Sequence, residues 1–540
     1  MINTADLQDL SNQNGGPPLA GPVDMRGRMT NEFRRFERYE TESSVAARFN
    51  SIAAQYRDRL AIRVDNRSYS YGELDAMSNC IAAAILQARG SVNEGVALFL
   101  SDPAWMIAAM FGVLKAGGFY IPIDPGQYSA RDQHILKDSC ARFILTSREH
   151  LGSARALSGA ARIISIDEID QTAVQNLPLI NVSPDALAFV IYTSGSTGEP
   201  KGVMQTQRNV LAIAMKNTNA LRINCHDRMT LLPAFTVGAS GSDVFGSLLN
   251  GAALFPLRVS QEGTAALKDL LITEAITICH SVPAVFRHLG ACLTEKLQVP
   301  NLRIIKLAGE AVLPGDLEIY RRLFPDSSLL HVGYGATEIN IICQLFLDKG
   351  SIIQGPVVPV GYPGDAVRVT IVDDGLDPVA ANRPGRIILG SRHLSTGYWG
   401  KPSLTASTFI PDPNVAGQTA YNTGDIGRLT LDGCLFHLGR GDRLVKVRGS
   451  GVDINELERY LAAIPGVGQA AAVLLPGPDG TGMLTALVTA DPGASLTEPT
   501  RICAAPPTPD SVKSGIASIM ALSTFTDACV EYQTPYRSLC

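Results

Sequence analysis

Short apolar runs alternate with segments of helical apolar spacing along most of the chain. Glycine, proline or polar residues bound the apolar runs, which is typical of buried strands. The predicted strands are residues 61–64, 96–100, 118–123, 143–146, 162–166, 187–192, 228–232, 275–279, 302–307 and 328–332. Helical spacing occurs between them, at 44–54, 69–85, 105–115 and 244–249. Strands that alternate with helices predict an α/β fold of parallel sheets with helices on both faces.

The two ends of the chain differ from its middle. Residues 1–40 are rich in Asn, Gly, Pro and Arg without a period, which predicts a disordered leader. Apolar runs at 371–373 and 385–390 predict a small β-rich unit, and the apolar pattern continues through 470–474 and 484–488. Residues 501–540 are rich in Pro, Ser, Thr and Cys and carry no such pattern.

Composition narrows the class of protein. The chain has 540 residues, of which 46% are apolar and 18% charged, so length alone predicts roughly two to four domains. A net charge of −5 with scattered Lys and Arg favours neither nucleic acid nor an anionic membrane as a partner. The start resembles no secretory signal, and no apolar run reaches the roughly 20 residues that span a bilayer. Ten scattered cysteines and eight scattered histidines predict free thiols in a reducing cytoplasm and no structural zinc.

The segment from Tyr192 to Gly202 carries the strongest chemical signal. It follows the predicted strand 187–192 and has the sequence Tyr-Thr-Ser-Gly-Ser-Thr-Gly-Glu-Pro-Lys-Gly. Glycines let backbone N–H groups turn inward, hydroxyls add donors and Lys201 adds a positive charge, so such a loop can wrap a polyphosphate. Its order fits neither a Walker A loop nor a Gly-x-Gly-x-x-Gly turn. A bare Ser/Thr/Gly run would favour a flexible polar loop instead.

The full string resembles the signature loop of the adenylate-forming (ANL) superfamily: acyl-CoA synthetases, luciferases and the adenylation domains of nonribosomal peptide synthetases. Further segments resemble motifs of the peptide-synthetase type in the expected order, namely 114–124, 308–311, 333–338, 421–427 and 439–449. Ala336 stands where proline is more usual, a mild departure. The resemblance covers roughly residues 45 to 490.

The residues of segment 333–338 suit nucleotide chemistry. A tyrosine on a glycine turn can lay its ring on a nucleobase, and a carboxylate beside it can hold Mg²⁺ that bridges phosphates. An isolated Tyr-Gly-x-Thr-Glu would be an ordinary capped turn. The resemblance implies that Tyr334 stacks on adenine, Thr337 contacts the α-phosphate and Glu338 binds Mg²⁺.

The resemblance also implies the remaining roles. The catalytic residues would be Thr193, Lys201, Thr337, Glu338 and Lys446. The residues that bind ATP would be Thr193, Ser194, Gly195, Ser196, Thr197, Gly198, Lys201, Gly309, Glu310, Ala311, Gly333, Tyr334, Gly335, Thr337, Asp425 and Arg440. Asp425 would accept hydrogen bonds from the ribose. Asp442 would be the hinge about which a small domain rotates, and Lys446 would act in the second, thioester-forming pose.

The acyl pocket departs from the amino-acid-activating pattern. Those enzymes carry Phe-Asp-x-Ser, whose Asp pairs with the substrate's ammonium, and this chain has Val-Gly-Ala-Ser with Gly238 at that position. The predicted substrate is therefore a small carboxylic acid without an ordinary α-amino group: aryl, fatty, α-keto or α-hydroxy. The predicted lining is Gly238, Ala239, Ser242, His280, Lys306, Gly333, Ile341 and Ile342. Lys306 could pair with a second acidic group of the substrate or point to solvent.

The C-terminus departs as well. Family members end in a small domain whose Gly-Lys motif reaches the substrate during adenylation, and here the pattern dissolves after residues 491–493. The tail is expected to be a truncation, an altered reading frame or a replacement. The expected domains are a leader (1–40), an adenylation core (41–441), a partial α+β C-terminal domain (442–490) and a divergent tail (491–540).

The resulting expectation is a cytoplasmic ligase that forms an acyl-adenylate from ATP. It would pass the acyl group to the phosphopantetheine of a carrier protein in trans, with coenzyme A as the alternative acceptor. A catalytically impaired nucleotide-binding remnant is the rival from another class, and the missing lysine is the argument for it.

Overall fold

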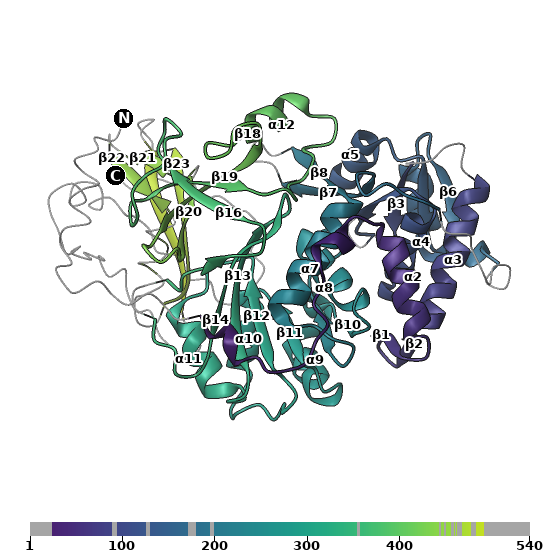
Figure 1. The fold of residues 1–540 in the computed structure, drawn as a ribbon, viewed down its shortest axis with the longest axis horizontal. Helices are drawn as coiled ribbons and strands as arrows, with labels where there is room; N and C mark the ends of the chain where they lie inside the picture. The colour runs from purple at the N-terminus through teal and green to yellow at the C-terminus, as the bar shows by residue number, and fades with distance from the viewer. Residues whose placement is uncertain are drawn as a thin grey trace, which may run out of the picture. The chain divides into compact units, whose positions relative to one another are not determined.

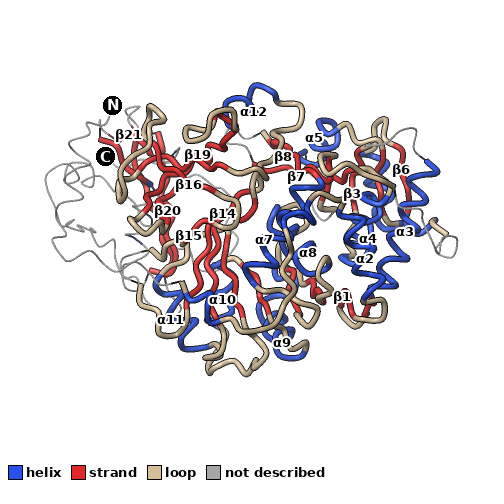
Figure 2. The backbone as a smooth tube through the Cα atoms, in the orientation of Figure 1, coloured by secondary structure: helices blue, strands red, loops and turns tan. Residues whose placement is uncertain are grey.

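The computed structural model describes residues 24–88, 94–125, 130–170, 180–194, 199–353, 357–441, 444–447, 450–454, 458, 461, 467–476 and 482–490. Helices alternate with strands, and the strands of the two large sheets are mostly parallel, which confirms the α/β prediction (Figures 1 and 2). The α-helices are α2 (Val45–Gln55), α3 (Tyr71–Ala88), α4 (Pro103–Lys115), α5 (Ala130–Ser139), α6 (Leu151–Leu157), α7 (Gln207–Leu221), α8 (Gly238–Leu248), α9 (Val259–Thr273), α10 (Pro283–Ala291), α11 (Pro314–Leu323) and α12 (Pro402–Thr408). Short 3₁₀ turns are η1 (Met25–Arg28), η2 (Arg38–Thr41), η3 (Arg148–His150) and η4 (Ile166–Glu168).

A nine-stranded sheet forms the larger half of the core. Its order is β15 (Tyr362–Pro363), β14 (Asn340–Leu347), β13 (Leu329–Ala336), β12 (Ile304–Ala308), β11 (Ile278–Ser281), β9 (Arg228–Leu231), β10 (Ala253–Pro256), β1 (Leu60–Val64) and β2 (Arg67–Ser70). The six strands from β13 to β1 are parallel, and β2, β14 and β15 pair antiparallel at the edges.

A six-stranded sheet carries the segment that leads into the predicted phosphate loop. Its order is β6 (Arg162–Ser165), β5 (Phe143–Thr146), β3 (Gly95–Phe99), β4 (Phe119–Ile123), β7 (Leu187–Ser194) and β8 (Pro200–Thr206). All its pairs are parallel except β7 with β8, which form a hairpin. The inner strands are buried along their whole length, which explains their continuous apolar sequence.

Helices cover both faces of the larger sheet. One apolar cluster joins α2, α3, α4, α7 and α8 to strands of both sheets, and a second joins α9, α10 and α11 to the other face of the nine-stranded sheet. Figure 1 shows α9, α10 and α11 grouped along one side of that sheet. Because both faces are covered, polar groups on these strands have access to a ligand only at strand ends or in a cavity.

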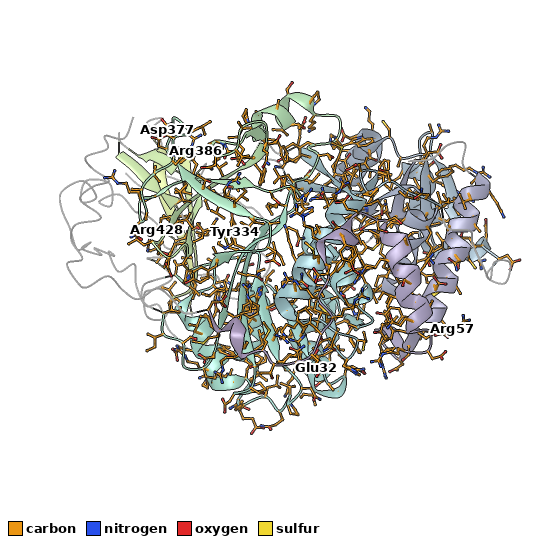
Figure 3. The ribbon with its side chains drawn as sticks, viewed as in Figure 1. Glu32, Arg57, Tyr334, Asp377, Arg386 and Arg428 are labelled. Atoms are coloured by element: carbon orange, nitrogen blue, oxygen red, sulfur yellow. The ribbon has the colours of Figure 1, made fainter. Side chains whose placement is uncertain are left out.

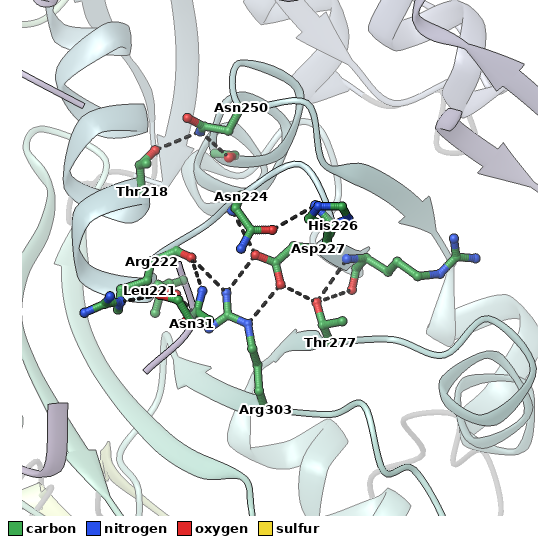
Figure 4. Close-up of polar contacts among 12 residues, drawn as sticks. Asn31, Thr218, Leu221, Arg222, Asn224, His226, Asp227, Asn250, Thr277 and Arg303 are labelled. Atoms are coloured by element: carbon green, nitrogen blue, oxygen red, sulfur yellow. Dashed lines mark hydrogen bonds and ion pairs between the residues drawn. The ribbon is translucent and has the colours of Figure 1, made fainter. Parts of the chain in front are cut away.

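A polar network fixes the amino ends of three parallel strands (Figure 4). Arg303, just before β12, donates to both oxygens of Asp227 at 2.8 and 2.9 Å, and the Thr277 hydroxyl donates to the same carboxylate at 2.7 Å. Asp227 and Thr277 precede β9 and β11. The opposite edge, at the carboxyl ends of the strands, is where ligands bind in open α/β sheets.

A five-stranded sheet forms the predicted small β unit. It contains β16 (Arg368–Val372), β17 (Gly385–Gly390), β19 (Thr419–Leu429) and β18 (Phe409–Pro411), and β20 (Leu435–Arg440) pairs with β19. Two hairpins follow, β21 (Leu444–Val447) with β22 (Ser450–Asp453), and β23 (Val467–Pro476) with β24 (Gly482–Ala490).

The chain divides into two compact units. The larger holds residues 20–423 and 428–436, and the smaller holds Gly424–Gly427 with the residues from His437 onward. The expected domain limits at 41, 441 and 490 stay predictions. Residues 1–23 and 491–540, which include the divergent tail, lie outside the described residues.

Two sequence expectations were wrong. The expected disordered leader is ordered from residue 24, because Phe36 is 1% exposed and exchanges two 3.0 Å hydrogen bonds with Asn219. The helix expected at 244–249 begins at Gly238 instead. Its first turns are Gly, Ala and Ser, which give no apolar period, so the pattern revealed only the second half.

Candidate active site

The β7–β8 hairpin sets two phosphate-loop residues opposite each other. In its register Thr193 pairs with Lys201, and directly opposed residues of an antiparallel pair share one face. The Thr193 hydroxyl is buried and has no hydrogen-bond partner within the described part of the chain. Gly195, Ser196, Thr197 and Gly198 lie outside the described residues, as does the side chain of Ser194. The hairpin therefore places a buried hydroxyl, which has no partner among the described residues, opposite a lysine.

Lys201, Glu338 and Tyr398 form a triangle of short contacts. The Lys201 ammonium donates to Glu338 Oε1 at 3.1 Å and to the Tyr398 hydroxyl at 2.9 Å, and that hydroxyl donates to Glu338 Oε1 at 2.7 Å. Burial and the neighbouring Glu338 raise the pKa of Tyr398, so its phenol stays protonated. The structure thus brings together two predicted residues, Lys201 and Glu338, and adds a third.

Sequence reasoning missed Tyr398. The residue lies on a loop that packs on β8: Trp399 N donates to Gly202 O at 2.7 Å, and Ser395 Oγ donates to Met204 O at 2.9 Å. Gly397 has a φ of +117°, and a Cβ there would overlap Thr405. An aromatic residue on a glycine turn drew attention to Tyr334, and the same signal was present at Gly397-Tyr398.

The end of β13 brings Thr337 against Gly238. A Cβ at Gly238 would lie 2.9 Å from Thr337 Oγ1, so the two residues are in contact. The Thr337 carbonyl accepts a 2.7 Å hydrogen bond from Gln205 on β8. Tyr334, labelled in Figure 3, is partly buried on β13 and lines a cavity with Gly333 and Gly335.

The three residues of the predicted adenine-side turn make different contacts: one lines the cavity, and two bind α10. Gly309, with a φ of +92°, lines the cavity. The Glu310 carboxylate accepts a 3.1 Å hydrogen bond from the backbone N–H of Ala284 in the first turn of α10. The Ala311 carbonyl accepts from Arg287 at 3.1 Å. Glu310 therefore caps a helix, as an acidic residue at a helix N-terminus commonly does.

A cavity of about 590 Å³ lies at this edge of the nine-stranded sheet. Seven of the eight predicted pocket residues line it: Gly238, Ala239, Ser242, His280, Lys306, Gly333 and Ile341. The prediction for Ile342 was wrong. Neighbouring strand residues face opposite sides, and Ile342 is fully buried in the cluster beneath the small β unit.

Three basic residues form one row across the cavity floor. In the parallel register His280 on β11 pairs with Lys306 on β12, and Lys306 pairs with His331 on β13. All three line the cavity, and each is at most 3% exposed. The alternative in which Lys306 points to solvent is therefore wrong. Sequence reasoning missed His331, because no motif marks it and only the register adds it to the row.

Asp243 on α8 supports this row from below. Both its oxygens lie 2.8 Å from His280 Nδ1, and Oδ1 lies 3.9 Å from the Lys306 ammonium. Lys306 also donates to Asn217 Oδ1 at 3.3 Å. We assign the His280 proton to Nδ1, since only a donor suits a carboxylate. Burial lowers the pKa of His280, of Lys306 and, most strongly, of His331.

The smaller unit holds the predicted ribose residues. Asp425 on β19 is 8% exposed, and its oxygens lie 3.3 Å from Arg440 Nη1 and 3.3 Å from His437 Nε2. Gly424 before it has a φ of +74°, which favours glycine. Asp442 lies outside the described residues, and Lys446 is on β21 with its side chain not described.

Among the described residues, no group of three or more His, Cys, Asp or Glu side chains is arranged to hold a metal ion. A single carboxylate such as Glu338 suits Mg²⁺, which keeps waters and phosphate oxygens as its other ligands. Of the helices in the described ranges, none combines the length and apolarity needed to cross a bilayer.

The family model described as "AMP-binding enzyme" matches residues 49–399. The chain belongs to this family of AMP-binding, adenylate-forming enzymes. Its match includes Lys201, Glu338, Tyr398 and the whole cavity floor, whereas Asp425 and Arg440 lie beyond it.

Curated relatives of this AMP-binding enzyme are peptide synthetases. It is 31% identical over 441 residues to tyrocidine synthase 2 of Brevibacillus parabrevis, covering 81% of this chain and 12% of that protein. It is 31% identical over 426 residues to gramicidin S synthase 2 of Brevibacillus brevis, covering 78% of this chain and 9% of that protein. The chain thus spans a small part of these relatives.

Solved structures share the fold of this AMP-binding enzyme. Klebsiella oxytoca NpsA in complex with 3-hydroxyanthranilyl-AMSN superposes with a TM-score of 0.72 at 22% identity, covering 84% of this chain and 90% of that one. ATP-bound MatB from Rhodopseudomonas palustris gives a TM-score of 0.72 at 20% identity, with the same coverage of 84% and 90%.

Proposed function

We propose that this chain activates a carboxylic acid with ATP, forming an acyl-adenylate and releasing pyrophosphate. The observation that carries the proposal is the contact of Thr337 with Gly238. Thr337 borders the acid cavity and directly precedes Glu338, which is paired with Lys201 of the phosphate loop. An acid in the cavity would therefore lie beside the residues that hold the triphosphate.

In the proposed reaction a carboxylate oxygen attacks the α-phosphorus of ATP. A new oxygen–phosphorus bond forms, the bond from the α-phosphorus to the oxygen that bridges to the β-phosphate breaks, and pyrophosphate leaves with that electron pair. Lys201 and the loop from Thr193 to Gly198 would hold the β- and γ-phosphates, and Thr337 would donate to the α-phosphate. The protein's contribution is positioning and charge neutralisation at phosphorus.

The residues present fit Mg·ATP. The Thr193 hydroxyl is buried without a partner in the described chain, and Glu338 is a buried carboxylate paired with Lys201, which lies opposite Thr193 in the hairpin. Mg²⁺ held by Glu338 would neutralise phosphate charge. Gly309, Gly333, Tyr334 and Gly335, with Glu310 and Ala311 behind them, would form the adenine side. Asp425 and Arg440 would bind the ribose.

We propose that the acid lacks an ordinary α-amino group. A Cβ at Gly238 would already crowd Thr337, and no carboxylate occupies that position. Asp243 is paired with His280 and Lys306, so it does not offer a partner to a substrate ammonium. The acidic residue among the described lining residues is Asp124, which is exposed.

The second step would pass the acyl group to a thiol. We favour the phosphopantetheine of a carrier protein in trans, because the curated relatives are peptide synthetases and a fused adenylation–PCP di-domain of Klebsiella oxytoca shares the fold with a TM-score of 0.65. Rotation about Asp442 would bring Lys446 into this step. Coenzyme A is the alternative acceptor.

Carboxylate-dependent ATP–pyrophosphate exchange on the purified chain tests the proposal. The panel contains α-amino, aryl, α-keto, fatty and dicarboxylic acids. Exchange with an amine-free acid is the expected result. Exchange with an α-amino acid alone would overturn the pocket argument, and ATP binding without any exchange would favour the impaired remnant.

A further inference from the structure

The floor of the acid cavity holds more basic groups than acidic ones. His280, Lys306 and His331 lie side by side on adjacent strands, and Asp243 is the acid that pairs with them. For Lys306, Asp243 is the charged group that acts on it. For His331, burial lowers the pKa first, and the basic groups Lys306, His280 and Arg26 lower it further. Among the described residues, three basic side chains at this end of the cavity therefore share a single carboxylate, that of Asp243.

The polar atoms of the row are incompletely satisfied. His331 is fully buried, its Nε2 lies 3.2 Å from Gln344 Oε1, and its Nδ1 has no partner in the described part of the chain. The Lys306 ammonium has three donors, but its described contacts are one 3.3 Å hydrogen bond and one 3.9 Å ion pair. Burying a cation with unused hydrogen-bond donors costs free energy unless a further acceptor binds those donors.

We propose that this floor receives the far end of the substrate acid, and that this end carries a second carboxylate. The inference rests on the proposed function and names its substrate class: a dicarboxylic acid, activated at one carboxylate and held by Lys306 at the other. His280 is the group that completes the charge balance. With Asp243 negative and Lys306 positive, a bound carboxylate leaves one negative charge, which a proton on His280 Nε2 neutralises beside Asp243.

Strand geometry sets how far Lys306 lies from the nucleotide side of the cavity. Lys306 precedes Ala308 by two residues, about 6–7 Å of strand rise, and Ala308 pairs with Gly333 where the nucleotide side begins. A substrate that spans this interval has a short chain or one ring between its carboxyl groups. An aliphatic end would instead leave the row facing apolar atoms.

Binding of non-reacting acyl-adenylate analogues tests the inference without turnover. Calorimetry on the purified full chain compares acyl-sulfamoyladenosines in matched trios that differ only at the far end. The carboxylate-ended members are glutaryl, adipoyl and 4-carboxybenzoyl. The methyl-ended members are pentanoyl, hexanoyl and 4-methylbenzoyl, and the amide-ended members are the ω-amides of the three diacids.

The expected result is that the best carboxylate-ended analogue binds about 10- to 100-fold more tightly than its methyl and amide partners, the range of a charge-assisted hydrogen bond. Equal or tighter binding of the methyl-ended analogues overturns the inference. Equal binding of the amide-ended analogues overturns it in favour of a neutral acceptor. Binding of the methyl-ended members also shows that the adenylate site works, whereas failure of all nine overturns the proposed function and the inference with it.

Lys306→Met should abolish the preference for the carboxylate while leaving the methyl-ended analogues bound. Lys216→Met is the matched control, since Lys216 is an equally buried lysine on α7 outside the cavity lining. Lys306→Gln replaces Lys306→Met if the latter fails to fold. A carboxylate preference that survives removal of Lys306 contradicts the assignment.

Discussion

Two lysine–carboxylate pairs lie in the larger unit of this molecule and differ in distance and in exposure. Lys201 and Glu338 are 3.1 Å apart, share the Tyr398 hydroxyl, and leave the lysine side chain 23% exposed. Lys306 and Asp243 are 3.9 Å apart, with side chains 4% and 1% exposed. In the first pair the two groups lie close together and the lysine is partly exposed, whereas in the second they lie farther apart and both are buried.

This difference in distance and exposure indicates a separate role for each pair. A partly exposed lysine can exchange a carboxylate for a phosphate at a lower cost than a buried one, because solvent screens both states. A desolvated lysine with a distant partner gains most from a new anion, because its charge is poorly compensated. We therefore assign Lys201 to the triphosphate and Lys306 to the acid, and the following predictions test that division.

Breaking the first pair should have the largest effect. Lys201→Met or Glu338→Gln removes a charge at the phosphates, and the exchange rate should fall by about 10²- to 10³-fold. Exchange kinetics at saturating acid measure it. Lys296→Met, which breaks a surface pair with Asp326, is the control and should leave the rate unchanged. A loss of under threefold for both site variants would contradict the assignment.

Lowering the pH should reduce the free energy of unfolding, because His331 in the cavity floor is held neutral in the folded state. Burial holds the pKa of His331 well below its usual value of 6.5, so the folded state disfavours its protonation. The stability that neutral His331 contributes is complete above pH 6.5 and is lost as pH falls below it. Between pH 6.5 and pH 5 the loss is at most about 2 kcal/mol for one such group.

Denaturant unfolding of wild type and His331→Gln at both pH values measures this loss. The variant should lose less stability than wild type over the interval. His226→Gln, at an exposed histidine, is the control and should behave as wild type. Parallel losses in wild type and His331→Gln would show that His331 is not held neutral.

Removing the Tyr398 hydroxyl, which contacts both members of the first pair, should lower the efficiency with ATP. Tyr398→Phe deletes the donor to Glu338 and an acceptor of Lys201 while keeping the ring that lies 4.4 Å from the ammonium. We expect kcat/KM for ATP to fall about 10-fold, the scale of one hydrogen bond to a charged group, with the KM of the acid unchanged. Tyr320→Phe removes a buried hydroxyl outside the site and should affect stability alone. An equal rise in the KM of the acid would point to general damage.

The smallest effect is expected at Gly238, where the acid cavity meets Thr337. In Gly238→Ala the new Cβ meets Thr337 Oγ1 at 2.9 Å, so the threonine side chain must shift by a few tenths of an ångström. Exchange should fall several-fold, on the order of 1 kcal/mol in transition-state free energy. Gly315→Ala, where a Cβ meets nothing within 4 Å, should have no effect. A rate unaffected by Gly238→Ala would remove the contact from the mechanism.

The sequence predicted the alternating strands and helices because these depend on local patterns. Continuous apolar runs indicated β3, β4 and β5, and the loop after β7 carried its own signature. The rest depends on chain segments that are distant in sequence. Tyr398 reaches Glu338 only because its loop packs on β8, and His331 joins Lys306 only through strand register.

The sequence predictions that were wrong also have physical explanations. Ile342 was assigned to the pocket by its place in a motif, but strand alternation turns it into the apolar cluster on the other side of β14. Residues 24–40 lack a period because they form 3₁₀ turns and extended segments, yet Met29 and Phe36 are buried in the core. Periodicity detects regular elements and misses a segment anchored by single side chains.

The division of labour between the two lysines is tested most directly by one pair of saturation series. ATP–pyrophosphate exchange of wild type, Lys201→Met and Lys306→Met is measured against ATP at fixed acid and against the best acid at fixed ATP. We predict that Lys201→Met lowers kcat or raises the KM for ATP, and that Lys306→Met raises the KM of the acid with ATP parameters within about twofold of wild type, since a group that does not touch the nucleotide leaves its binding nearly unchanged. A change in the ATP parameters of Lys306→Met as large as that in its acid parameters would contradict this division.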